Sequence, residues 1–151
     1  MQKLQYVGAM VMGLLVLSGA TFAQDAVQTE QIDCAEAQTQ SDLNACAKMD
    51  FDEADSNLND AYKAAVAKMQ EMDQAATDEA ATDEGATDGG AEAALREAQR
   101  TWVTFRDQAC ASEGWTVHGG SMEPMVVLEC MARISATRAD DLWSLSEAGG
   151  G

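Results

Sequence analysis

Apolar residues in the second half of the chain recur at alternating spacings of three and four: Leu95, Ala98, Trp102, Phe105 and Ala109. This period places them on one face of an α-helix, while Arg96, Arg100 and Asp107 fall outside that face. Residues 91–113 are therefore predicted to form an amphipathic helix whose large aromatic side chains pack against the rest of the protein.

The same period predicts two further helices. The stripe of residues 41–72 is rich in alanine, which suits close helix packing, and consists of Leu43, Ala47, Phe51, Ala54, Leu58, Ala61 or Tyr62, Ala65, Met69 and Met72. Thr39 followed by Asp42 has the spacing of a capping box and marks its start. The stripe of residues 121–145 consists of Met125, Leu128, Met131 or Ala132, Ser135, Ala139 and Leu142. Ser121 is its predicted N-cap, and Pro124 is tolerated in a first turn.

These elements predict an all-α fold: a small disulfide-linked helical hairpin or bundle of about three main helices, preceded by a short turn of helix at residues 33–38. Residues 76–90 read ATDEA, ATDEG and ATDGG. They lack any large apolar side chain that could offset the entropy of ordering, and we expect a flexible acidic loop there. Residues 146–151 are expected to fray. The single domain would then span residues 33–145.

The N-terminus has the features of an export leader. Lys3 precedes an apolar run at residues 7–17, and small residues follow up to Ala23. This run is too short to span a bilayer, so residues 1–23 are predicted to be a signal peptide and residues 24–32 a polar lead-in. The leader has the shape of a lipoprotein leader but lacks its cysteine. We therefore expect a periplasmic or secreted protein that is not inserted in the membrane.

The net charge of the chain argues against some classes of binding partner and favours others. The chain has a formal net charge of −17, and the predicted leader contains one lysine and no acid, so the exported part would be one unit more negative. Such a chain repels the phosphates of nucleic acids and anionic membranes and favours cationic protein partners. Simple solubility is the alternative explanation of the charge.

The four cysteines, Cys34, Cys46, Cys110 and Cys130, all follow the leader and predict two disulfides. Of the three connectivities, we favour Cys34–Cys46 and Cys110–Cys130, because each would bridge the arms of a local hairpin. No cysteine–histidine cluster with zinc spacing is present, and no metal or cofactor is expected. The sequence also lacks the motifs of a nucleophilic serine, a phosphate loop or a zinc hydrolase, so we do not expect an enzyme.

Two aromatic residues lie in the glycine-rich connection between the last two predicted helices. Trp115 is off any helical stripe and close to His118, the single histidine of the chain. An amphipathic ring in a loop is typical of a partner contact, but it could equally cover the base of a helix pair. Both interpretations of Trp115 stay open at this point.

The order of these residues resembles the LprI-like family of bacterial lysozyme inhibitors. The resemblance rests on Asp33-Cys34, Thr39-Gln40, Leu43-Asn44, Cys46, Leu58-Asn59 and Tyr62, then on a block with Leu95, Ala98-Gln99-Arg100, Trp102, Phe105-Arg106-Asp107 and Cys110, and finally on Gly119-Gly120-Ser121, Cys130, Thr137-Arg138 and Leu142. It implies an exported helical domain. The signature positions are expected to be mainly structural: Trp102, Phe105, Arg106, Asp107, Gly119, Gly120, Ser121 and Arg138.

The resemblance, the leader and the charge together favour a protein that binds and inhibits a cationic lysozyme and so protects peptidoglycan. The alternative hypothesis is a structural or adaptor protein of the cell envelope without inhibitory activity, since fold transfers between relatives more readily than function does.

Overall fold

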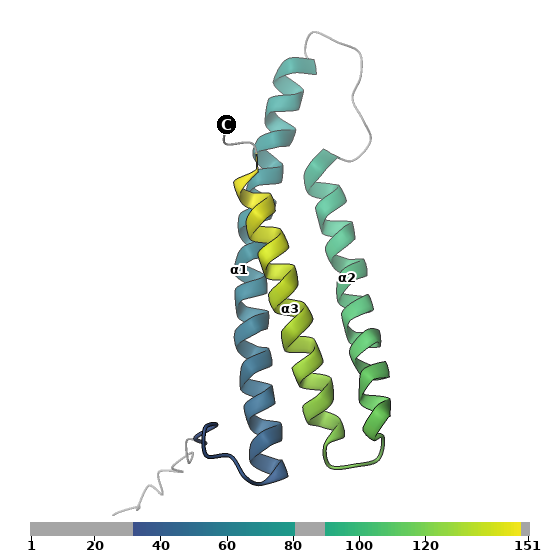
Figure 1. Cartoon of the computed structure of the whole chain (residues 1–151). Coiled ribbons are helices and arrows are strands. Elements are labelled where there is room, and N and C mark those ends of the chain that lie inside the picture. The colour runs from purple at the N-terminus through teal and green to yellow at the C-terminus, as the bar shows by residue number, and fades with distance from the viewer. Residues whose placement is uncertain (1–31, 81–89, 149–151) are drawn as a thin grey trace, which may run out of the picture. The chain divides into compact units, whose positions relative to one another are not determined.

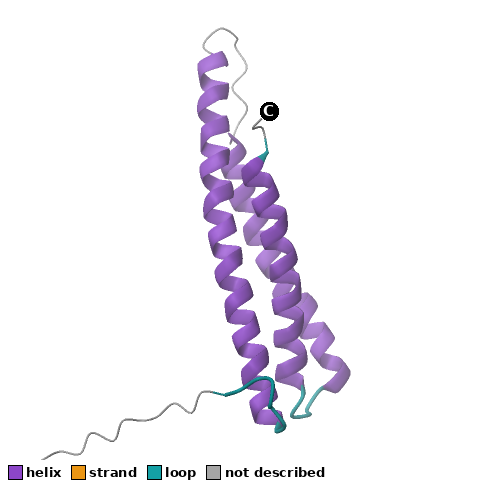
Figure 2. Ribbon diagram, turned by 60° about the vertical axis from the view of Figure 1, so that its left-hand side comes forward, coloured by secondary structure: helices purple, strands orange, loops and turns teal. Residues whose placement is uncertain are grey.

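The computed structural model of the protein describes residues 32–80 and 90–148, which belong to one compact unit, Gln31–Gly151. These residues form three long helices, α1 (Gln40–Ala80), α2 (Gly90–Gly114) and α3 (Glu123–Glu147), with a short 3₁₀ helix, η1 (Trp115–Val117), between the last two. The described ranges contain no strand, so the predicted all-α bundle of three main helices is confirmed (Figures 1 and 2).

Several predicted segments lie outside the described residues. They are the leader at residues 1–23, nearly all of the lead-in, residues 81–89 of the acidic segment and residues 149–151 of the tail. The assignments made for them stay predictions. None of the helices in the part of the chain that the structure describes is long and apolar enough to cross a bilayer.

The start of α1 follows its predicted cap. The Asp42 N–H donates to Thr39 Oγ1 at 3.1 Å, and the Thr39 hydroxyl donates to the Asp42 carboxylate at 2.7 Å. Before it, residues 33–36 form a single turn instead of the predicted turn of helix. Its geometry is set by Asp33, whose carboxylate accepts the Ala35 N–H at 3.0 Å and whose carbonyl accepts the Glu36 N–H at 3.1 Å. A carboxylate that satisfies the backbone in this way competes with helix formation.

The far end of α1 corrects the predicted boundary. The helix continues eight residues past 72 and takes in residues 76–80, for which the sequence predicts a loop. Alanine and glutamate are good helix formers, and α1 contains no glycine or proline that would break it. The absence of large apolar residues removes packing at this end, but it does not stop the backbone from extending an existing helix.

The core lies mainly between α1 and α3. Ala61, Ala65 and Ala139 are fully buried, and their small side chains let the two helices approach closely around Leu142. Leu58, Met69 and Leu95 complete the buried apolar cluster. The stripes predicted for α1 and α3 supply most of these positions. Met72, at the end of the α1 stripe, is instead 48% exposed.

The N-terminus of α2 is fixed by a residue of α1. The Asp73 carboxylate accepts the backbone N–H groups of Ala91 and Glu92, so it caps α2 from the neighbouring helix. Gly90 makes this approach possible, because it has a φ of +52° and a Cβ at this position would lie 2.7 Å from Asp73 Oδ2.

The buried face of α2 is rotated by one residue from its prediction. Leu95, Arg106 and Cys110 are buried, and Trp102 packs against the core, as its predicted packing role requires. Phe105, which was also predicted to pack, is 60% exposed, and Ala98 is exposed too. The apolar pattern predicted the wrong face because Arg106, and not Phe105, occupies the next inward position after Trp102. The long side chain of Arg106 reaches the interior, where the guanidinium is buried and hydrogen-bonded.

Both predicted disulfides are present. Cys34–Cys46 ties the N-terminal turn to α1, and Cys110–Cys130 ties the end of α2 to the start of α3. All four cysteines lie within the described residues, and none of them is free. The α3 helix begins at Glu123, two residues later than predicted, and continues to Glu147, two residues into the tail that was expected to fray.

Candidate functional site

The connection between α2 and α3 presents a stacked aromatic pair at one end of the bundle. The rings of Trp115 and His118 are parallel to within 20°, with their centroids 4.0 Å apart. Trp115 is 67% exposed and His118 is exposed as well. The structure therefore brings together the two residues that the sequence suggested as a partner contact. Trp115 does not cover the base of the helix pair, because a lid residue would be buried there. Its role as a contact stays a prediction.

Glu123, the first residue of α3, holds this pair in place. Its carboxylate accepts the Gly119 N–H at 2.7 Å, and its second oxygen lies 3.0 Å from His118 Nδ1. The Gly119 N–H, and after it His118, lower the pKa of Glu123 below its ordinary value. Gly119 has a φ of +77°, a conformation that favours glycine, and this turns the chain so that its N–H faces the carboxylate.

Ser121 does not have its predicted role. The N-cap of α3 is Met122, which makes no side-chain cap hydrogen bond. The Ser121 carbonyl instead accepts a hydrogen bond from Asn44 Nδ2 of α1 at 3.2 Å. Next to it, the Gly120 N–H donates to the Val117 carbonyl at 3.0 Å. The beginning of α1 therefore lies beside the connection and fastens it from the other side (Figure 1).

The end of α2 is packed closely against α3. A Cβ at Gly114 would lie 2.5 Å from Val127 Cγ2, so only glycine allows this approach. The Cys110–Cys130 disulfide locks the same two helices one turn further along. The Thr116 hydroxyl donates to the Glu113 carbonyl at 2.8 Å. We call residues 114–122 the connector. The contacts described above fix its conformation before any partner binds.

Arg106, one of the predicted signature residues, lies at the centre of a polar cluster inside the bundle. The Arg106 guanidinium contacts Asp55 of α1 at 3.0 Å, Asp107 at 2.9 Å and Ser135 of α3 at 3.4 Å. Arg106 also lies over the rings of Phe51 and Trp102, 5.3 and 5.5 Å from their centroids. These contacts join all three helices and leave Arg106 without access to a ligand.

Arg138, another predicted signature residue, joins α3 to α2 by donating to Gln99 Oε1 at 3.1 Å.

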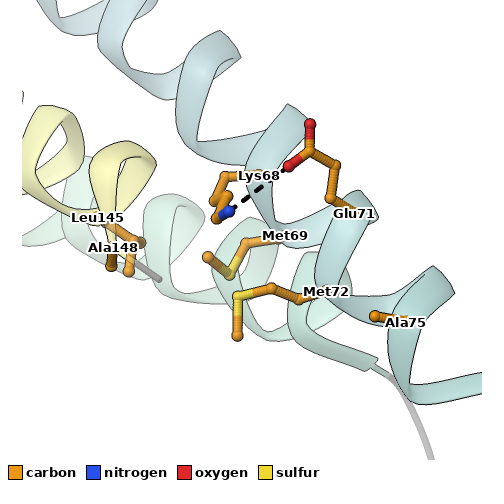
Figure 3. Close-up of a pocket in the computed structure, with 7 residues that line it drawn as sticks. All are labelled: Lys68, Met69, Glu71, Met72, Ala75, Leu145 and Ala148. Atoms are coloured by element: carbon orange, nitrogen blue, oxygen red, sulfur yellow. Dashed lines mark ion pairs between the residues drawn. The ribbon is translucent and has the colours of Figure 1, made fainter. Parts of the chain in front are cut away.

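Sequence reasoning did not find an apolar groove at the opposite end of the bundle. About 510 Å³ in volume, it lies where α3 ends against the longer α1, and it is lined by Lys68, Met69, Glu71, Met72, Ala75, Leu145 and Ala148 (Figure 3). The ion pair between Lys68 and Glu71 stands at its edge, with 3.5 Å between Nζ and Oε2. The α1 residues of the groove lie mostly within the predicted helix, and only Ala75 belongs to the extension beyond residue 72.

The titratable side chains of the described ranges do not gather into a metal site. No group of three or more histidine, cysteine, aspartate or glutamate side chains that could hold an ion occurs there. The distinct feature at the connector end of the bundle is an exposed aromatic pair on a segment with a fixed conformation. Exposed aromatic side chains of this kind are common at protein interfaces.

Comparison with known proteins gives two matches. The model of the protein family described as "Lysozyme inhibitor LprI" matches residues 33–142. An uncharacterized protein of Rhizobium meliloti (strain 1021) is 41% identical over 121 residues, which cover 80% of this chain and 84% of the relative. No solved structure matches significantly.

Proposed function

Because the chain belongs to the LprI family of lysozyme inhibitors, we propose that it is an exported protein that binds a cationic lysozyme and inhibits it. The family match carries this proposal, since it covers α1, α2, most of α3 and both disulfides. Disulfides persist outside the cytoplasm, and peptidoglycan, the substrate of lysozyme, lies there too. The predicted signal peptide at residues 1–23 would direct the protein to the periplasm or the medium.

The charge of the chain supports a basic partner. A net charge of −17 attracts a cationic enzyme over distances beyond contact and raises the rate of encounter. Exposed acids occur in the N-terminal half of α1, the half whose first turns contact the connector through Asn44, among them Asp50 and Glu53. Among the residues that the structure describes, no ion pair involves either of these two side chains, so their charges are available to a partner.

The direct test is the lysis of a peptidoglycan suspension by a basic lysozyme, with and without the oxidised protein. We expect stoichiometric inhibition that exceeds the effect of an unrelated protein of equal charge. Inhibition should weaken between low salt and 0.15 M salt, where the screening length is about 8 Å. Inhibition equal to that of the control protein, or none, would contradict the proposal and favour an envelope protein of another function.

Two double variants that remove equal charge test which acidic residues attract the lysozyme. Asp50→Asn with Glu53→Gln removes two exposed charges in the N-terminal half of α1, while Asp140→Asn with Asp141→Asn removes two exposed charges in the C-terminal half of α3. We expect the first pair to lower the association rate at low salt about threefold to tenfold and the second pair to change it less. Equal effects would show that only the net charge acts.

A further inference from the structure

The connector is a segment without acidic or basic side chains in a strongly acidic protein. Residues 114–122 contain no aspartate, glutamate, lysine or arginine, although the chain has 26 acidic residues. The acids that flank the connector are both engaged. Glu113 is paired with Arg133 at 2.9 Å, and Glu123 is held by His118 and Gly119. The most exposed tryptophan of the described chain therefore projects from a segment without formal charge, apart from any proton on His118.

This segment is also preorganised. Trp115 is stacked on His118, Gly119 is fixed by Glu123, and Ser121 is fixed by Asn44. A tryptophan held in this way offers a large apolar surface and loses little conformational freedom on binding. Rigid aromatic residues at the centre of an interface are the common hot spots of protein recognition.

The substrate cleft of a lysozyme has the complementary chemistry. Two carboxyl groups flank the scissile glycosidic bond, and one of them sits in a hydrophobic pocket. An acidic segment that entered such a cleft would meet like charges in a desolvated place, whereas an uncharged aromatic segment would not. The surface outside the cleft of a basic lysozyme is cationic and suits the acids of α1.

We propose that the connector, residues 114–122, occupies the glycan-binding cleft of the lysozyme, with Trp115 as its anchor. This inference rests on the proposed function and adds where on the enzyme the protein binds. Inhibition is then competitive with substrate, and the two parts of the surface have separate roles. The acids on α1 set the rate of encounter, and Trp115 sets the lifetime of the complex.

The first test measures binding to a basic lysozyme by titration calorimetry, with and without a soluble N-acetylglucosamine oligomer that fills the cleft. The oligomer should displace the protein. Trp115→Ala should raise the dissociation constant about 30-fold, as expected for a hot-spot residue. The matched control is Trp143→Ala, because Trp143 is also exposed but lies on α3 toward the other end and donates to Asn57 of α1. It should bind like the unchanged protein.

The second test adds one negative charge at two places. Ser121 is exposed within the connector, and Ala136 is exposed on α3. If the net charge alone governed binding to a basic enzyme, Ser121→Glu and Ala136→Glu would both bind at least as tightly as the unchanged protein. We expect Ser121→Glu to weaken binding at least tenfold and Ala136→Glu not to weaken it.

The outcomes separate the two proposals. If the unchanged protein does not bind lysozyme, the proposed function fails. If it binds but the oligomer does not compete, or if Trp115→Ala and Ser121→Glu bind normally, the function stands and the connector is not in the cleft. Circular dichroism spectra and unfolding midpoints of each variant confirm that a loss of binding is not a loss of fold.

Discussion

Arg106 of α2 and Asp55 of α1 form an ion pair across the bundle, with 3.0 Å between Nη1 and Oδ1. Arg106 is only 8% exposed, and its plane of N–H donors also serves Ser135 and Asp107. A lysine could not reproduce this arrangement, because its ammonium group is a compact charge without the planar fork of donors. The position therefore holds three helices together through geometry as much as through charge.

Replacing Arg106 should destabilise the protein strongly. Arg106→Ala leaves Asp55 and Ser135 without their partner and opens a cavity between two aromatic rings, so we expect the free energy of unfolding to fall by about 3 kcal/mol. Arg100→Ala is the control, since Arg100 is exposed and paired only with Glu97 of its own helix, and it should change stability by less than about 0.5 kcal/mol. Urea unfolding measures both. Equal losses of unfolding free energy in the two variants would mean that the contacts of Arg106 do not hold the three helices together.

The rotated face of α2 gives a second prediction. Trp102 packs against the core and Phe105 is largely exposed, although the two are one helical turn apart. Trp102→Ala should cost about 2–3 kcal/mol of stability, and Phe105→Ala less than about 0.5 kcal/mol. Thermal and urea unfolding of the two variants decide the register of this helix. A larger loss for Phe105→Ala would restore the face that the spacing alone suggested.

The sequence predicted the elements of this fold better than their limits and their rotation. Stripes such as Leu58, Ala61 and Ala65 identify a helix and its buried side because packing imposes the period. The same logic failed for Phe105, since a buried arginine took the inward place and its partner Asp55 lies 51 residues earlier in the chain. The extension of α1 was also missed, because helix propensity without a stripe leaves no periodic signal.

For the candidate site, the sequence singled out Trp115 and His118 as residues outside any stripe. It could not show that they stack, because the contact depends on Gly119 adopting a positive φ and on Glu123 folding back onto it. The hydrogen bond between Asn44 and Ser121 could not be predicted either, since 77 residues separate them in the chain. Local spacing reports a helix face, but contacts between distant segments follow from how the helices pack.

Removing the second disulfide should have two effects. Cys110–Cys130 closes a loop of 20 residues, and the chain-entropy model assigns about 3 kcal/mol to such a closure. Cys110→Ala with Cys130→Ala should lose that stability and also change the near-ultraviolet circular dichroism of Trp115, because α2 and α3 are no longer locked beside the connector. Cys34→Ala with Cys46→Ala should lose stability but leave that signal unchanged. If both double variants alter the signal alike, the second disulfide has no particular role at the connector.

The lowered pKa of Glu123 predicts a pH dependence of the connector. A carboxyl group whose pKa falls on folding stabilises the folded form fully above its ordinary pKa of 4.5. That contribution is lost as the pH falls through the lowered value. The amide resonance of Gly119 should therefore show a shift at acid pH whose midpoint lies below the ordinary pKa of a glutamate. Glu123→Gln should abolish this acid shift. An acid shift of Gly119 that persists in Glu123→Gln would contradict the assigned cause.

The attachment of α2 at both ends has a consequence for the architecture of the chain. Asp73 caps its first turn and Cys110–Cys130 closes its last, so the position of α2 is defined without reference to the covalent link that joins it to α1. Such an attachment tolerates changes in the length of the connection between α1 and α2, including the insertion of a foreign domain. That connection can thus be redesigned while the connector at the opposite end of the bundle keeps its geometry.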